Sequence, residues 1–297
     1  MNESAVSPNL DAGHIGTSKN SRFRETLYRL AKDWVFIVAS VVMGAILGSA
    51  ILAPLVATHD PLSISILSRL QPIGSEGHIL GTDELGRDMY SRLIYGARLS
   101  LAMALLPVFF AFGIGTGLGV AAGYFGGTIN SIIMRSIDVF FAFPSVLLAI
   151  AISGALGSST TNVILSLVIV FVPPISRVAE SRTTEVVGLE YIDAARISGA
   201  SDFTIIRVHL FSNIVGPVFV YASSMISVSI ILASGLSFLG LGVKPPTPEW
   251  GVMLNTLRNA IYVQPWVAAL PGCFIFVSSL CFNLISDSIR TAMDIKP

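Results

Sequence analysis

Charged side chains are scarce in this 297-residue chain. Asp, Glu, Lys and Arg make up 12% of the residues, while hydrophobic residues make up 53% and the mean hydropathy is +0.76. Average soluble domains carry about twice that charged fraction, so a water-soluble globule is excluded and an integral membrane protein is predicted. The 18 basic and 18 acidic side chains cancel. The net charge therefore gives no indication of a nucleic-acid partner.

Motifs for catalysis and for metal binding are also missing. The sequence contains no GxxxxGK[ST], no GxSxG and no HExxH, so the chain has no P-loop route to ATP hydrolysis. We expect no catalytic residue, no metal and no cofactor of its own. The two cysteines, Cys273 and Cys281, lie too far apart for a CxxC site and are expected to be buried free thiols. Any energy for uphill work must then come from a partner.

What the sequence has instead is long apolar runs with at most two charged residues each. Each is of membrane-spanning length, and together they predict an all-α integral membrane protein with six transmembrane helices at 34–57, 99–124, 132–156, 162–178, 215–242 and 266–286. We divide the chain into a partly disordered N-terminal tail at 1–33, a first helix with its following loop at 34–98, and a five-helix core at 99–297.

The orientation follows from the cationic side chains. With the N-terminus inside, 12 of the 18 Lys and Arg residues fall on the cytoplasmic face, as the positive-inside rule requires. Both termini are then cytoplasmic, as is the loop at 180–214 between the fourth and fifth helices, while the loop at 60–98 is periplasmic. A cleaved signal peptide is not expected, because the first apolar run is too long and begins too late.

The loop between the fourth and fifth helices has the pattern of a helix–turn–helix. Gly199 is a natural stop for a first helix, because glycine takes a positive φ without strain. Ser201 and Asp202 can cap a second helix. Apolar residues recur at helical spacing on both sides of the turn, at Leu189, Ile192 and Ala195 and then at Phe203, Ile206 and Leu210. The pattern alone fits an ordinary amphipathic hairpin equally well.

The sequence Asp193-Ala194-Ala195, followed after three residues by Gly199, resembles the EAA loop of bacterial ABC importer permeases. That resemblance implies a coupling helix that docks into a groove on an ATPase subunit. The residues it assigns to this contact are Glu190, Asp193, Ala194, Ala195, Arg196 and Gly199.

A second region extends the resemblance over about residues 34–295. The run LGTDELGRDMYSRLIYGARLSL, then FAFPSVLLAIAI, LSFLGLGVKPPTPEWG and Gln264-Pro265-Trp266, resemble the C-type subunit of the dipeptide/oligopeptide permease family. Within the first run we expect an interfacial helix capped by Thr82, with the ion pairs Asp83–Arg87 and Asp88–Arg92 at i,i+4. Three positions depart from the family pattern, namely Asp193 in place of Glu, Ser212 in place of Pro, and Glu249 in place of a small residue.

The resemblance implies a multi-pass subunit of the bacterial inner membrane, surrounded by lipid, that pairs with a second homologous permease. Two ATP-binding cassette ATPases would supply energy, and a periplasmic binding protein would deliver the solute. Family members serve dipeptides, oligopeptides, glutathione, nickel complexes and opines, so we expect transport of a peptide or a related small solute by alternating access.

Small and polar residues in the predicted helices suggest further roles. Gly44 and Gly48, and the series Gly115, Gly119 and Gly123, permit close approach between helices. The fifth predicted helix carries a stripe of serines on one face, made of Ser223, Ser227, Ser234 and Ser237. This serine stripe either lines a substrate path or packs against other helices through hydrogen bonds.

Two other classes of membrane protein fit the sequence less well. An ion-coupled secondary transporter usually carries intramembrane carboxylates and two related halves, and neither is visible here. An intramembrane enzyme needs a nucleophile–base or metal constellation within the bilayer, and the sequence offers none.

Overall fold

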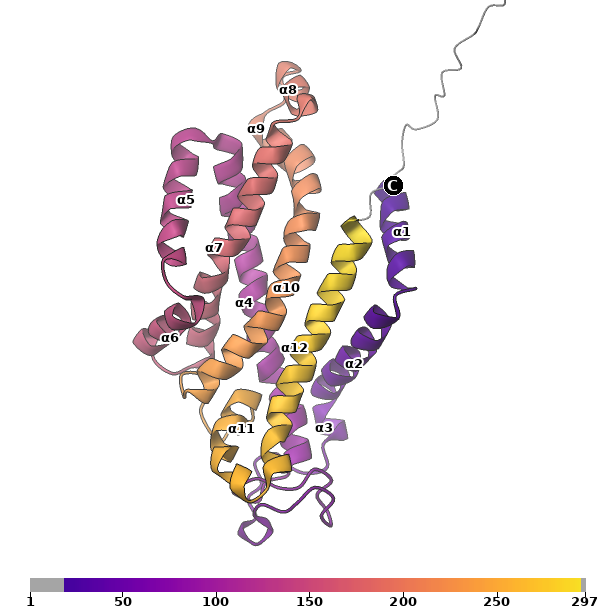
Figure 1. Cartoon of the computed structure of the whole chain (residues 1–297), viewed down its shortest axis with the longest axis vertical. Coiled ribbons are helices and arrows are strands. Elements are labelled where there is room, and N and C mark those ends of the chain that lie inside the picture. The colour runs from indigo at the N-terminus through magenta and orange to yellow at the C-terminus, as the bar shows by residue number, and fades with distance from the viewer. Residues whose placement is uncertain (1–18, 295–297) are drawn as a thin grey trace, which may run out of the picture.

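The computed structural model describes residues 19–294, and within that range the chain is helical and contains no β-strand. Figure 1 shows the helices gathered into one elongated bundle, with α8 at one end and α11 with a long loop at the other. The main helices are α1 Lys19–Leu30, α2 Trp34–Ile51, α3 Ala53–Val56, α4 Met89–Phe125, α5 Gly127–Phe141, α6 Ser145–Leu156, α7 Thr160–Val187, α8 Glu190–Ile197, α9 Asp202–Thr204, α10 Phe211–Phe238, α11 Trp250–Thr256 and α12 Pro265–Asp294. Short helical segments at Ile66–Ser68, Ile205–Leu210 and Leu257–Tyr262 complete the described secondary structure.

Within residues 19–294, five helices are long and apolar enough to cross a membrane, and a bent pair makes a sixth if it counts as one span. The all-α membrane fold is thereby confirmed. The third predicted span differs from expectation, because α5 and α6 meet at 89° instead of forming one straight helix. The break lies at Phe143-Pro144, where proline precedes the first residue of α6. Proline restricts the residue before it to extended backbone, so a helix ends there.

Helices α4 and α7 share the most extensive contact of any two described helices, and glycine makes this contact possible. A Cβ atom at Gly115 would lie 2.9 Å from Ile175, and one at Gly123 would lie 2.7 Å from Thr183. At Gly119 a Cβ would overlap the backbone oxygen of Ser176. The predicted close approach is therefore confirmed for this series.

The other glycine pair behaves differently. No described atom lies within 4 Å of a Cβ placed at Gly44 or Gly48. Helix α2 is the least buried of the candidate spans, so this pair makes no close contact within the described part of the chain.

The predicted interfacial helix at Thr82 is not present. Residues 57–88 form a loop, and α4 begins at Met89 with Asp88 as its N-cap, whose side chain accepts a hydrogen bond from Ser91 N. Of the two predicted ion pairs, Asp83–Arg87 forms at 2.6 Å, but it is buried inside the loop. Arg92 pairs with Asp83 at 3.2 Å instead of with Asp88.

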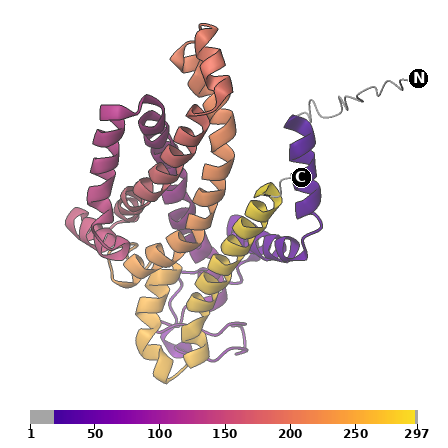
Figure 2. The same cartoon turned by 45° about the horizontal axis from the view of Figure 1, so that its top comes forward.

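The two ends of the described chain lie close together. Helix α1 runs beside the end of α12 in both views (Figures 1 and 2). Ser288 Oγ of α12 donates a 2.5 Å hydrogen bond to Asp33 Oδ2, at the start of α2. Residues 19–30 of the predicted tail are thus helical, and the expectation of disorder for 1–18 lies outside the described residues.

Candidate functional site

The hairpin that joins α7 to α10 stands at the end of the bundle (Figure 1). Ile192, which is fully buried, anchors α8 to the bundle. It belongs to a small core that also holds Val120 and Tyr124 of α4 and Ile205, Leu210 and Ile214 of the returning chain. The hairpin is therefore held by its own apolar contacts and not by backbone connections alone.

The turn of the hairpin is a Schellman motif. Ala200 N–H donates to Ala195 O at 3.1 Å, and Gly199 N–H donates to Arg196 O at 3.0 Å. These are the two bonds that define the motif when the residue after the C-cap is left-handed, and Gly199 has φ of 82°. The predicted stop at Gly199 is present for the predicted reason.

The second half of the hairpin departs from expectation. Ser201 caps the next helix, as predicted, by accepting a hydrogen bond from Thr204 N. That helix does not end before the membrane, however, because α9, a π-helical segment at Ile205–Leu210 and α10 run on as one membrane-spanning unit, Asp202–Phe238. Ser212 stands in this continuous helix, where the family pattern would place a proline.

The polar face of α8 is open to solvent. Glu190, Asp193, Ala194 and Arg196 are exposed, and Ala195 is half-buried. Asp193 and Arg196 pair with each other at 3.4 Å, and the Arg196 guanidinium lies 5.6 Å from the centre of the Tyr124 ring. The residues that the resemblance assigns to coupling are thus accessible, and their role stays a prediction.

Two apolar side chains add to this surface, and the sequence did not single them out as contacts. Ile197 is 87% exposed and Phe203 is 70% exposed. They flank the Gly199 turn on opposite sides in sequence. Of the predicted apolar face of the second helix, Leu210 is buried and Ile206 is half-buried, whereas Phe203 is exposed and Ile205 is buried instead.

The serine stripe lies mostly inside the subunit. Ser227, Ser234 and Ser237 are buried, and Ser223 is half-buried. Ser223 Oγ and Ser227 Oγ donate to carbonyls of their own helix at 2.8 Å, and Ser279 of α12 donates to Ser227 O at 3.1 Å. This arrangement favours the packing alternative for Ser227. A role in lining a path stays a prediction.

Glu249, whose departure from the family pattern was unexplained, has a clear structural role. It is fully buried, caps α11 by accepting from Gly251 N and Val252 N at 2.9 Å, and accepts from Ser100 Oγ of α4 at 3.0 Å. Burial raises the pKa of this carboxyl despite the hydrogen bonds that oppose the shift. The residue locks α11 against α4.

Of the two cysteines, Cys281 is buried as expected, whereas Cys273 is exposed, and neither is in a disulfide. A side chain on the outer surface of a membrane-spanning helix meets lipid, so the exposure of Cys273 is compatible with its apolar character.

A helical bundle with five or six candidate spans among the described residues, and a structured polar hairpin at one end, is the architecture of a polytopic membrane protein. The chain belongs to the family described as binding-protein-dependent transport system inner membrane component, which matches residues 115–295. It is therefore a permease subunit of an ABC importer and a multi-span protein of a bacterial inner-membrane transporter family.

Relatives and a solved structure agree with this assignment. The chain is 40% identical over 279 residues to the glutathione transport system permease protein GsiD of Pectobacterium atrosepticum, covering 94% of this chain and 93% of that protein. It is 39% identical over 276 residues to the dipeptide transport system permease protein DppC of Alkalihalophilus pseudofirmus, covering 93% and 90%. An inward facing structure of the MetNI methionine ABC transporter shares the fold, with a TM-score of 0.51 at 18% identity over 69% of this chain and 97% of the matched chain.

Proposed function

We propose that this chain forms one half of the membrane channel of an importer for peptides such as dipeptides, oligopeptides or glutathione, or for a related small solute. A second homologous permease would complete the channel, and two ATPase subunits would drive it. A periplasmic binding protein would deliver the solute. The names of the relatives support the substrate class, because they include glutathione and dipeptide systems.

The observation that carries this proposal is the free surface of the hairpin. Ile197 and Phe203 are too exposed to stabilise the subunit itself, and apolar side chains within a polar rim are typical of protein contacts. In an ATPase groove they would supply buried apolar area. Glu190, Asp193 and Arg196 would add charge-assisted hydrogen bonds at the rim, and Ala194 and Ala195 would leave room for close approach.

The orientation is part of the proposal. We place α8 and both termini in the cytoplasm, and the loop at 60–98 in the periplasm. The excess of Lys and Arg on the α8 side supports this orientation. The positions of α1 and the end of α12 at that same end of the bundle fit it as well (Figure 1).

The chain would not hydrolyse ATP itself, because the sequence holds no P-loop. ATP would act only on the partner ATPases. Closure of the two ATPases would pull the hairpins together and convert the channel from inward-facing to outward-facing.

The test is reconstitution of the chain in liposomes with its partner permease, the ATPases and the binding protein. Peptide uptake should require ATP, and ATP hydrolysis should rise when the loaded binding protein is added. The chain alone should neither hydrolyse ATP nor transport. Uptake by the chain alone under a proton gradient, without ATP, would instead establish the ion-coupled secondary transporter.

A further inference from the structure

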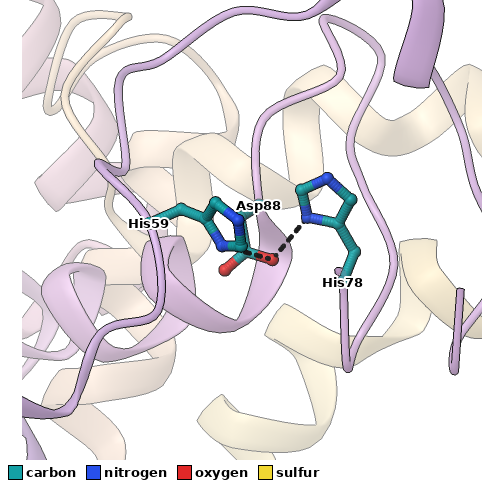
Figure 3. A group of neighbouring side chains, drawn as sticks. All are labelled: His59, His78 and Asp88. Atoms are coloured by element: carbon teal, nitrogen blue, oxygen red, sulfur yellow. Dashed lines mark hydrogen bonds and ion pairs between the residues drawn. The ribbon is translucent and has the colours of Figure 1, made fainter. Parts of the chain in front are cut away.

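Three side chains with metal-binding chemistry lie close together beside the start of α4 (Figure 3). They belong to the long loop at the end of the bundle opposite α8 (Figure 1). His59 follows α3, His78 lies in the loop before α4, and Asp88 is the N-cap of α4. No short spacing motif links them, which is why no metal was expected from the sequence. The loop at 57–88 brings them together.

The distances within this cluster are close to those of a metal site. His78 Nδ1 lies 2.9 Å from Asp88 Oδ1, and His59 Nδ1 lies 3.9 Å from the same oxygen. Each of the three residues offers a ligand atom, and these atoms all lie within 4.8 Å of one another. Ligand atoms around tetrahedral zinc are about 3.3 Å apart, given bonds of roughly 2.0–2.1 Å. Small rotations of the two imidazole rings would therefore suffice.

The carboxylate is held so that one oxygen faces the imidazoles. Asp88 Oδ2 accepts hydrogen bonds from Ser91 N at 2.8 Å, from Ser91 Oγ at 2.7 Å and from Thr58 Oγ1 at 3.1 Å. Its other oxygen, Oδ1, is left to the histidines. Supporting hydrogen bonds of this kind orient ligating carboxylates in metalloproteins.

Accessibility differs among the three side chains in a way that suits an exchangeable site. The Asp88 side chain is 1% exposed and that of His78 is 16% exposed, whereas that of His59 is 43% exposed. An ion could thus enter beside His59 and bind to the buried, hydrogen-bonded carboxylate of Asp88. Neutral imidazole nitrogen with carboxylate oxygen is a donor set that suits zinc and neighbouring transition metals better than magnesium or calcium.

We propose that His59, His78 and Asp88 form a binding site for a divalent transition-metal ion, with Zn²⁺ the best fit to three protein ligands and one water. The bound ion would tie the loop at 57–88 to the first turn of α4. The site is independent of the hairpin at the other end of the bundle, so it does not rest on the proposed coupling. With the proposed orientation, the site would face the periplasm and bind metal ions from there.

The experiment uses the full chain, purified in detergent through an affinity tag that contains no histidine. Zn²⁺ binding is measured by calorimetry, and Co²⁺ is used as a spectroscopic probe of tetrahedral coordination. The variants are His59→Phe and His78→Gln, with His209→Gln as the matched control, because His209 lies near Tyr191 in the hairpin. His59→Phe keeps the Asp88–His78 hydrogen bond and so tests the site without disturbing the cap of α4.

One equivalent of Zn²⁺ should bind to the native chain and to His209→Gln. Binding should weaken in His59→Phe and His78→Gln by more than the roughly 10–100-fold that loss of a mere supporting partner costs. Zn²⁺ should raise the melting temperature of the native chain but not that of His59→Phe. The proposal is overturned if the native chain shows no saturable binding, or if His59→Phe binds as tightly as the native chain, since the cluster would then be only a hydrogen-bonded cap.

Discussion

Tyr124 Oη donates a 2.6 Å hydrogen bond to Asp202 Oδ1 and so joins the end of α4 to the first residue of α9. The same ring lies beneath the Arg196 guanidinium at 5.6 Å. One side chain of the bundle thus contacts the hairpin on both sides of the Gly199 turn. The hairpin is positioned by α4 as well as by the helices that it connects.

Replacing Tyr124 separates these two contacts. Tyr124→Phe should lose the hydrogen bond, worth about 1 kcal/mol, but keep the stacking with Arg196. Tyr124→Leu should lose both. Hydrogen exchange of the amides at 198–204 should accelerate modestly in the first variant and more in the second. Equal protection in all three proteins would show that α4 does not position the hairpin.

The Gly199 turn provides a test that depends on backbone conformation alone. No atom of the described residues lies within 4 Å of a Cβ at this position, so a substitution meets no steric clash there but must adopt φ of 82°. Gly199→Val should cost about 1–3 kcal/mol in strain and misplace the hairpin, whereas Gly199→Asn should be tolerated because asparagine visits left-handed backbone. Substrate uptake, normalised to the amount of permease in the membrane, should fall only for valine. Normal uptake by Gly199→Val would contradict the role given to this turn.

The exposed apolar residues of the hairpin should matter for ATPase attachment. Burying an isoleucine or phenylalanine side chain contributes about 1.5–3 kcal/mol, so Ile197→Ser and Phe203→Ser should each reduce ATPase co-purification about tenfold or more. Ile261→Ser is the matched control, because Ile261 is 53% exposed but belongs to the segment Leu257–Tyr262 that follows α11, the helix at the opposite end of the bundle (Figure 1). An equal loss with the control substitution would mean that general destabilisation, and not docking, is responsible.

The orientation can be read from chemical labelling. Single cysteines at Ser201 and Ser75, introduced after replacement of Cys273 and Cys281, should respond oppositely to an impermeant maleimide in intact spheroplasts. Ser75 lies in the loop at 57–88 and should be labelled, while Ser201 in the hairpin should be protected until the membrane is permeabilised. Labelling of Ser201 from outside would invert the proposed topology.

Glu249 should make stability depend on pH. Because its folded-state pKa is raised by burial, the folded protein binds more protons than the unfolded chain at pH values between the two pKa values. Stability from this group is then highest below the unfolded pKa and falls as pH rises through the window up to the folded pKa. The melting temperature of the native chain should therefore decline relative to that of Glu249→Gln as pH is raised from about 4.5. Parallel pH profiles would show that Glu249 does not change its proton on unfolding.

The sequence predicted best what local chemistry decides. Long apolar runs located the spanning helices, and Gly199 marked the turn because few other residues adopt its φ. The bend at Phe143-Pro144 was not predicted, because the run at 132–156 carries only two charged residues, Arg135 and Asp138, and its length alone counted it as one span.

What escaped prediction depends on contacts between distant residues. Thr82 is a residue type that often caps helices, but no helix begins there. Asp83 forms ion pairs with Arg87 and Arg92 instead, and the helix begins at Met89. Likewise, His59 and Asp88 meet only because the intervening loop folds back. No periodicity or spacing records such a contact.

The close packing of Gly115, Gly119 and Gly123 against α7 has a mechanical consequence for α4. The 37 residues of α4 extend about 55 Å at 1.5 Å per residue. From Gly115 onward this helix packs tightly against α7, the helix that leads into the hairpin. The opposite end is fixed by the Asp88 cap and by Trp250, whose Nε1 donates to Leu93 O at 2.9 Å. Pro107 stands between the two clamped parts and removes one backbone hydrogen bond there. Pro107 is therefore the position at which α4 would bend most easily. A displacement of the hairpin would move the part of α4 after Pro107, while the part before Pro107 would stay with the far end of the bundle.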